Sequence, residues 1–354
     1  MTHTTADKRA AFRAMHEQGC FILPNAWDVG SARFLQGLGF DGLATTSAGF
    51  AWSDGRADNT SSCQMVLQRM RDIVRATDLP VNADFENGFA DDLDGLGENV
   101  CRAVQTGVAA LSIEDSRVDA DSPLFSIDEA VERLRVARSR IDEMGGDTLL
   151  VGRAENFFIG RPDLADTVTR IKAYAEAGAD ILYAPGISTP QEIAAVVAAA
   201  GGKPVNLLIG SDSTLTLQEI ARLGVRRISV GAALARSAWG GFMRAAAALA
   251  RGELNGFGEL ANGRQLNTYF QVTGERRLAA QPASITGKVE YREGDGPLLT
   301  IPKGKVEVET TAVDAVVTWS DGTARGVAAM PVANFCQYVA DGAIAIANVP
   351  PLPL

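Results

Sequence analysis

The sequence predicts an α/β protein, a (β/α)8 TIM-type barrel followed by extra C-terminal helices and a small β-rich C-terminal appendage. Two observations predict the barrel. Short apolar segments alternate eight times with helical patterns over the first two thirds of the chain, and acidic residues gather where several of these segments end. A doubly wound open sheet is the alternative, but no Gly-x-Gly-x-x-Gly motif follows the first segment.

Each predicted strand is a short apolar run, and the runs lie at residues 21–24, 41–45, 80–84, 109–113, 148–152, 180–183, 204–208 and 226–230. Amphipathic helices fill the intervals. Ser126 and Glu129 form a capping box that predicts a helix reaching Ile141, and another helix covers 167–177 before Gly178. This alternation predicts parallel strands whose carboxyl ends share one face of the barrel.

Two more helices are predicted after the eighth strand, at Ala232–Arg251 and Glu259–Gln271. They complete a barrel domain over residues 1–275. The composition then changes, and residues 281–354 are predicted to form a separate β-rich extension.

Alternating polar and apolar residues predict strands within this extension. Lys305–Glu309 alternates, and Ala315–Trp319 precedes a Ser-Asp-Gly turn and a further strand at Arg325–Ala329. These segments are too few for an independent sheet with a large core, so we expect the extension to pack on the barrel or on a neighbouring subunit. Its expected role is a structural cover or an oligomer contact, with ligand binding as the alternative.

Composition argues against several classes of partner. The formal net charge is -10, which disfavours nucleic acid and anionic membranes but leaves room for a local basic pocket. No apolar run is long enough to span a membrane, and the first seven residues lack the basic and apolar regions of a secretory signal. We therefore expect a cytoplasmic protein with no nucleic-acid and no membrane partner.

Histidine and cysteine usage narrows the chemistry. The chain has two histidines, His3 and His16, and both precede the first predicted strand, which argues against Ser-His-Asp or Cys-His catalysis and against a zinc site. No Cys-x-x-Cys pair is present, which predicts reduced, mostly buried thiols. The four cysteines are Cys20, Cys63, Cys101 and Cys336.

Acidic residues converge at the predicted carboxyl ends of strands. Asp84 and Glu86 project to the same side because strand side chains alternate with period 2. Glu114 ends the next strand, and Asp58 lies in the loop after the second. Four acids at one end of a sheet repel one another unless a cation neutralises them, so the sequence predicts a hard, oxygen-ligated ion, Mg²⁺ or Mn²⁺. The alternative is a set of helix-capping or solvated acids.

Two further features suit an anionic ligand. Arg153 follows the fifth strand, and its planar guanidinium matches a carboxylate or phosphoryl group, unless it forms a structural ion pair with Glu155. The small residues of 45–49 follow the second strand, and their backbone amides are suited to bind an anion.

Six motifs in order resemble the isocitrate lyase and phosphoenolpyruvate mutase superfamily over residues 10–275. They are Leu23–Asp28, Ala44–Gly49, Ala83–Phe89, Ile113–Ser116, Ala184–Gly186 and Ile228–Gly231. The resemblance implies a (β/α)8 barrel with an extra C-terminal helix that is often exchanged between subunits, hence a homodimer or homotetramer. It also implies a Mg²⁺ ion and an α-oxyanion carboxylate substrate, such as a 2-oxo or 2-hydroxy acid.

Carried over residue by residue, the resemblance implies that Asp84 is the direct metal ligand, while Asp58, Glu86 and Glu114 hold metal-bound waters. Arg153 matches the arginine that grips the distal group of the substrate, so Arg153 and Glu114 are the candidate catalytic residues. The remaining substrate-binding candidates are Thr46, Ser47 and Ala48 for the substrate carboxylate and, by looser matches, Asn206, Trp27 and Asp28, with packing as the alternative for Trp27.

The segment after the fourth strand departs from the family. Residues 115–125 contain no Cys, His or Lys, whereas isocitrate and methylisocitrate lyases carry a lid Cys that donates a proton. We therefore expect a Mg²⁺-dependent carbon-carbon lyase or decarboxylase that acts on a small dicarboxylate through an enolate, oxaloacetate decarboxylase-like or methylisocitrate lyase-like. One alternative is phosphonomutase or phosphonopyruvate hydrolase chemistry. The other is a non-catalytic metabolite-binding barrel, which loss of Asp84 or Glu114 would have favoured.

Overall fold

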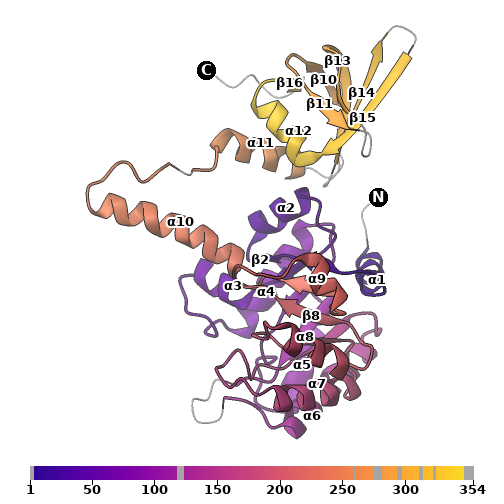
Figure 1. Ribbon diagram of the computed structural model, residues 1–354, viewed down its shortest axis with the longest axis vertical. Coiled ribbons are helices and arrows are strands. Elements are labelled where there is room, and N and C mark those ends of the chain that lie inside the picture. Colours follow the sequence, from indigo (N-terminus) through magenta and orange to yellow (C-terminus); the bar gives the residue numbers. More distant parts are fainter. Residues whose placement is uncertain are drawn as a thin grey trace. The chain divides into compact units, whose positions relative to one another are not determined.

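The computed structural model describes residues 4–117, 123–258, 260–274, 281–292, 297–310, 314–321 and 324–346. Its first part is the predicted TIM-type barrel of parallel strands alternating with helices (Figure 1). The sheet has the order β1-β9-β8-β7-β6-β5-β4-β3-β2. Its strands are β1 (Phe21–Leu23), β2 (Asn25–Ala26), β3 (Leu43–Thr45), β4 (Val81–Asp84), β5 (Ala110–Glu114), β6 (Leu149–Arg153), β7 (Ile181–Tyr183), β8 (Val205–Leu208) and β9 (Arg227–Ser229).

Each of the eight predicted strands overlaps an observed one, and the ninth arises because Pro24 divides the first. Proline has no N–H to donate to a ladder, so the chain changes partner there. β1 pairs with β9 on one side, β2 pairs with β3 on the other, and the Pro24 carbonyl accepts a hydrogen bond from the amide of Ala44. The two short pieces together close the barrel.

Helices alternate with the strands, and most begin at a Ser, Thr or Asp whose side chain accepts a hydrogen bond from the first turn. The predicted capping box of Ser126 and Glu129 is confirmed. Gly178 follows the seventh helix with φ 104°, which favours glycine. The helices are α1 (Thr5–Met15), α2 (Val29–Gly37), α3 (Ser47–Ser53), α4 (Cys63–Ala76), α5 (Leu93–Val104), α6 (Ile127–Glu143), α7 (Leu164–Glu176), α8 (Pro190–Ala199), α9 (Leu217–Arg222) and α10 (Ala233–Ala250).

The barrel interior changes from apolar to polar along β5. Residues of one face follow period 2, and on β5 they read Ala110, Ser112 and Glu114. Beneath them, near the amino ends of the strands, lies an apolar cluster that includes Phe12 of α1 and Leu149 of β6. Polar side chains are therefore concentrated at the carboxyl ends, where barrel active sites form.

The chain divides into two compact units, residues 1–32 with 41–242, and residues 33–40 with 243–354. The predicted domain boundary falls at 275–280, which lies outside the described residues. The second unit contains a five-stranded sheet, a two-stranded sheet and helices α11 (Gly263–Gly274) and α12 (Val332–Ala340). Its strands are β10 (Gln281–Ile285), β11 (Glu290–Arg292), β12 (Leu298–Thr300), β13 (Gly304–Thr310), β14 (Asp314–Asp321), β15 (Ala324–Pro331) and β16 (Ile344–Ile346).

The expectation that the extension lacks an independent sheet with a large core is wrong. The three predicted strands correspond to β13, β14 and β15, but β10 and β16 widen the sheet to the order β15-β14-β13-β10-β16. Its buried cluster includes Val306, Val317, Met330 and Phe335, the last of them from α12. The extension therefore buries its own apolar residues.

Two composition-based expectations can be compared with the described residues. All four cysteines are free, but Cys20, Cys63 and Cys101 are half-buried and Cys336 alone is buried, so the expectation of mostly buried thiols is wrong. Cys63 is the first residue of α4, one turn before the first buried residues of that helix, Val66 and Leu67. No helix in the described ranges is both long and apolar enough to cross a membrane.

Candidate active site

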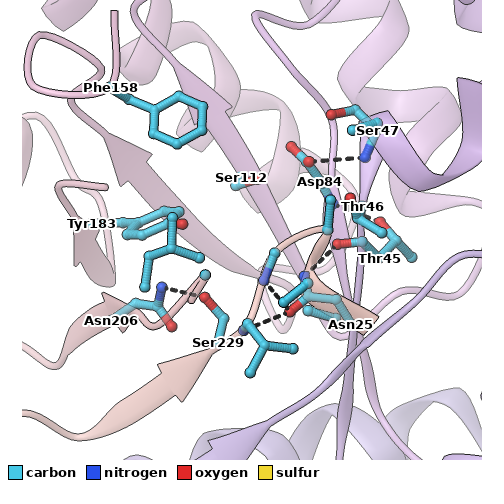
Figure 2. Close-up of a pocket in the computed structure, with 18 of the residues that line it drawn as sticks. Asn25, Thr45, Thr46, Ser47, Asp84, Ser112, Phe158, Tyr183, Asn206 and Ser229 are labelled. Carbon is cyan, nitrogen blue, oxygen red and sulfur yellow. Dashed lines mark hydrogen bonds between the residues drawn. The ribbon is translucent and has the colours of Figure 1, made fainter. Parts of the chain in front are cut away.

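A cavity of about 620 Å³ opens at the carboxyl ends of the barrel strands. This volume suits a small organic ligand. Figure 2 shows Asp84 beside Ser47 on one side of the cavity, with Tyr183 and Asn206 on another. Of the residues predicted from the sequence, the cavity wall contains Thr46–Ala48, Asp58, Asp84, Arg153 and Asn206.

Asp84, the last residue of β4, is held by the loop after β3. Its amide donates to Oγ1 of Thr45 at 2.9 Å, and its Oδ2 accepts from the Ser47 amide at 3.1 Å. Its Oδ1 lies 3.3 Å from Nη1 of Arg153. The carboxylate is thus fixed at the cavity wall with one oxygen toward the arginine.

Glu86 is buried behind this wall in a strained backbone conformation. Its φ of 46° lies in the left-handed region, which costs a non-glycine residue roughly 1 kcal/mol. Its Oε1 is buried and has no hydrogen-bond partner. Burial raises the pKa of Glu86 to about 8, and the charges of Asp84, Glu114 and Asp58 contribute to the increase. A buried acid without a partner is a site for a proton or a cation.

Arg153, at the end of β6, lies among three carboxylates. Its Nη1 is 3.2 Å from Oε2 of Glu114, and its Nε donates to Glu155. Burial alone would lower the pKa of Arg153, but Glu114, Glu155 and Asp84 raise it well above its ordinary value. The predicted ion pair with Glu155 is therefore present, and it coexists with contacts to two of the predicted metal-site acids.

Glu114 is buried at the end of β5 and is fixed from two sides. Ser116 donates its hydroxyl to Oε1 at 2.5 Å, and Arg153 contacts Oε2. Burial raises the pKa of Glu114 in spite of the arginine. The neighbouring Asp115 instead pairs with Arg170 at 2.8 Å and accepts the Glu155 amide, which ties β5 to β6.

Asp58 enters the cavity wall from the loop after α3. Loss of solvent around its carboxylate raises the pKa of Asp58, and the charge of Asp84 adds to this effect, while hydrogen bonds from the Asn59 amide and the Ser47 hydroxyl oppose it. The residue as a whole is exposed. The charges of the other three predicted acids all raise the pKa of Glu86, so the four carboxyl groups lie close enough to interact. Of the four, Asp58 and Asp84 line the cavity itself.

The donor set fits a hydrated hard cation. Among the described residues, no three His, Cys, Asp or Glu side chains lie close enough to hold one metal ion together. Mg²⁺ does not need such a cage, because it retains several waters and is commonly bound by one or two carboxylates. Asp84 at the wall, with the partnerless oxygen of Glu86 behind it, matches that mode of binding.

The predicted carboxylate-binding loop forms the start of α3. Thr46 is its N-cap and accepts from the Gly49 amide at 3.4 Å, while the Ser47 amide is already paired with Asp84. Trp27 does not line the cavity. A Cβ placed on Gly49 would lie 2.7 Å from the Cβ of Trp27, so close packing against α3 accounts for this tryptophan.

Sequence reasoning missed several cavity residues on the interior face of the strands. Register pairs Glu114 with Arg153, Arg153 with Tyr183, Tyr183 with Asn206 and Asn206 with Arg227, so these side chains share one face. A residue two positions before the end of a strand faces the same side as the last residue. Counting back by two from each predicted site residue would therefore have identified several of them. The missed cavity residues include Asn25, Asn82, Ser112, Tyr183, Arg227 and Ser229.

The segment predicted to replace the family lid is described only at its ends. Ser116 bridges Leu124, and the Arg117 amide donates to the Pro123 carbonyl at 2.9 Å. Residues 118–122 lie outside the described residues.

A parallel barrel with an acid-rich cavity at the carboxyl ends of its strands defines the class of TIM-barrel proteins that bind small molecules at this face. Residues 12–250 match the family model of phosphoenolpyruvate phosphomutase. The chain therefore belongs to this family, and the predicted isocitrate lyase and phosphoenolpyruvate mutase superfamily is confirmed.

Individual relatives carry names of several activities. The chain is 31% identical to an oxaloacetate decarboxylase of Bradyrhizobium diazoefficiens over 56% of its own length and 74% of that protein. It is 45% identical to a protein of Burkholderia cenocepacia J2315 that is described only as a lyase/mutase, with a TM-score of 0.73 over 75% of this chain and 97% of the other. A phosphonopyruvate hydrolase in complex with oxalate and Mg²⁺ is 26% identical, with a TM-score of 0.65 over 75% and 94% of the two chains.

Proposed function

We propose that this protein is a Mg²⁺-dependent carbon-carbon lyase or decarboxylase that acts on a small 2-oxo or 2-hydroxy dicarboxylate through an enolate. The acidic residues support the proposal most directly. Asp84 lines the cavity, and Glu86, whose pKa the charge of Asp84 helps to raise, has a buried carboxylate oxygen without a hydrogen-bond partner. Asp84 would hold Mg²⁺, or Mn²⁺ in its place, directly, and Asp58, Glu86 and Glu114 would hold it through water. When bound, the ion would supply positive charge where the substrate 2-oxo oxygen becomes negative.

The residues around the acids would orient the substrate. In this proposal the loop Thr46–Ala48 takes the carboxylate next to the reacting carbonyl, and Arg153 maintains the charge balance of the acids at the cavity wall. Loss of CO₂ from an oxaloacetate-like acid needs no proton donor, and water can protonate the enolate afterwards. A lid without Cys, His or Lys is compatible with that reaction.

One named relative, an oxaloacetate decarboxylase, supports the carbon-carbon lyase. The structure of another contains oxalate, a small diacid, with Mg²⁺, which supports the metal and the diacid ligand but not the bond that is cleaved. The latter is a phosphonopyruvate hydrolase, so cleavage of a carbon-phosphorus bond is the second candidate function. A cavity whose wall includes the buried Arg227 and the half-buried Arg153 suits a phosphonate as well as a carboxylate.

We also propose a cytoplasmic homodimer or homotetramer. On α10 the aromatic side chains of Trp239 and Phe242 are exposed and in edge-to-face contact with each other. Exposed aromatic residues of this kind are typical of subunit contacts. Sedimentation of the full-length protein would test the assembly.

A substrate screen tests the proposed activity. Purified protein would be incubated with oxaloacetate, substituted malates and phosphonopyruvate, each with Mg²⁺, Mn²⁺ or EDTA, while pyruvate and phosphate are followed in parallel. Because oxaloacetate loses CO₂ slowly without enzyme, matched reactions without protein and with the Asp84→Ala variant are the controls. Pyruvate without phosphate, lost with EDTA, is expected. Turnover of phosphonopyruvate alone would establish the second candidate, and no turnover would favour the non-catalytic barrel.

A further inference from the structure

Arg227 is a buried cation on the interior face of the barrel, at the first position of β9. It is 2% exposed and belongs to the cavity wall. Its Nε donates to Oδ1 of Asn206 at 2.8 Å, and its Nη1 donates to Oδ1 of Asn82 at 3.1 Å. Strands β4, β8 and β9 thus converge on one guanidinium, although their residues lie far apart in the sequence.

The partners of Arg227 are neutral, which sets it apart from Arg153. Within the described part of the chain, no carboxylate lies within 4.0 Å of the Arg227 guanidinium, whereas Arg153 contacts three acids. Burial lowers the pKa of Arg227 to about 10, and Tyr183 opposes the shift only partly. Arg153 already has a surplus of negative charge around it, and Arg227 has none.

The guanidinium also has unused donors. Arginine carries five N–H groups, and across the described residues the Nη2 of Arg227 makes no hydrogen bond while Nε and Nη1 make one each. A buried charge without a counter-ion lowers stability, and an apolar side chain of similar length would fill the space more favourably. A cation at such a position in a ligand cavity has the properties of a binding group for an anion.

We propose that Arg227, oriented by Asn82 and Asn206, binds the distal anionic group of the substrate. The inference rests on the proposed function and extends it, since it makes the substrate an acid with an anionic group at each end. One end lies at the Asp84 side of the cavity and the other at Arg227. Arg153 lies among the acids that would also hold the metal ion, whereas Arg227 has no anionic partner among the described residues.

Ligand binding to the full-length protein with Mg²⁺ tests this assignment. The probes are oxalate, which lacks a distal group, malate, and malate 4-amide, in which the distal carboxylate is a neutral amide. 2-Hydroxy-3-phosphonopropionate tests whether the subsite prefers a phosphonate. Arg227→Met removes the charge, Arg227→Gln is a second neutral variant in case the first does not fold, and Arg226→Met is the matched control, because Arg226 lies outside the cavity wall and bonds the Gly19 carbonyl.

Wild-type protein should bind malate or the phosphonate at least tenfold more tightly than the 4-amide. Arg227→Met should abolish that preference, change oxalate binding by less than twofold and leave the melting temperature equal or higher, because an unpaired charge has been removed. A lower melting temperature with malate preference intact, in either neutral variant, would show a structural role and overturn the assignment. If wild-type protein binds neither oxalate nor malate, the proposed function fails together with the subsite.

Discussion

Nη1 of Arg153 lies 3.3 Å from Oδ1 of Asp84, so the residue predicted to bind the metal directly is paired with a guanidinium in the described structure. The same nitrogen is 3.2 Å from Glu114. One cation thus lies between two acids that would otherwise repel each other across the ends of β4 and β5. A divalent ion at Asp84 and this arginine would both act on the charge of the same carboxylates, which makes the two residues the most informative positions for mutation.

Asp84→Ala should abolish turnover and the Mg²⁺ dependence of thermal stability. The carboxylate is the cavity-lining acid with a fixed orientation, so its removal leaves the ion without a direct protein ligand. Glu114→Gln should reduce turnover less, because a water-mediated contact tolerates an amide. Melting curves with Mg²⁺ or EDTA, together with pyruvate release, measure both effects. Full activity of the Asp84→Ala protein would refute the metal site.

Arg153→Ala should reduce pyruvate release at least tenfold and should also destabilise the protein. Removing one partner of a buried ion pair leaves uncompensated charge, at a cost of about 3 kcal/mol. Here Glu114 and Glu155 would both lose their contact. Arg153→Lys is the matched variant, since it retains the charge and should recover stability more than activity. Denaturant unfolding separates the two effects, and an unchanged free energy of unfolding in Arg153→Ala would contradict this account.

The barrel could be predicted because its signals are local. Each strand is a buried apolar run followed by a helix start, and Asp84 and Glu114 could be found because they end such runs. The subsite of Arg227 could not, because it forms only when β9 is brought beside β8 and faces Asn82 across the closed barrel. Contacts between residues 145 positions apart leave no local pattern.

The extension was underestimated for a related reason. β16 is three residues long, and β10 contains Pro282, so neither shows a readable alternation. Their pairing joins Ala283 to Ile346 across the whole extension. The core of this sheet depends on pairing between distant segments, which single-sequence periodicity does not report.

A cysteine-free protein should retain turnover. Burial raises the pKa of Cys63, and it raises the pKa of Cys336 to about 12, so these groups are thiols and weak nucleophiles at neutral pH. None of the four cysteines belongs to the cavity wall. Replacement of Cys336, which is 3% exposed, should lower the melting temperature. Restoring Cys336 alone should recover that loss. A folded cysteine-free variant without activity would show that a thiol takes part in the reaction.

Removal of residues 281–354 should leave the chemical step intact, because the residues of the cavity wall lie between Asn25 and Arg236. Gly326→Val offers a test in the intact chain. A Cβ at Gly326 would lie 2.2 Å from the Trp319 ring, so the variant should unfold the extension at a lower temperature without changing turnover. Loss of all turnover with oligomeric state and melting temperature unchanged would mean that the extension reaches the active site.

Stability should fall at acidic pH because of His16, which is 6% exposed. Its Nδ1 contacts the Phe12 carbonyl at 2.7 Å, so Nδ1–H is the donor. The buried Nε2 would take up the second proton, and it has no hydrogen-bond partner to accept from the N–H that would form. Burial, followed by the charge of Arg227, lowers the pKa of His16 from 6.5 to about 3. Below pH 6.5 the unfolded chain therefore binds a proton that the folded protein does not, and stability is lost progressively as the pH falls toward 3.

Between pH 7.5 and pH 5, this residue alone should reduce the free energy of unfolding by about 2 kcal/mol. His16→Gln replaces the ring with a group that stays neutral and can still donate to the Phe12 carbonyl. Urea unfolding at the two pH values should show a smaller loss in the variant than in wild-type protein. Arg227→Met should also reduce the loss, because it removes one of the charges that hold the pKa of His16 down. Equal losses in all three proteins would assign the acid sensitivity to other groups.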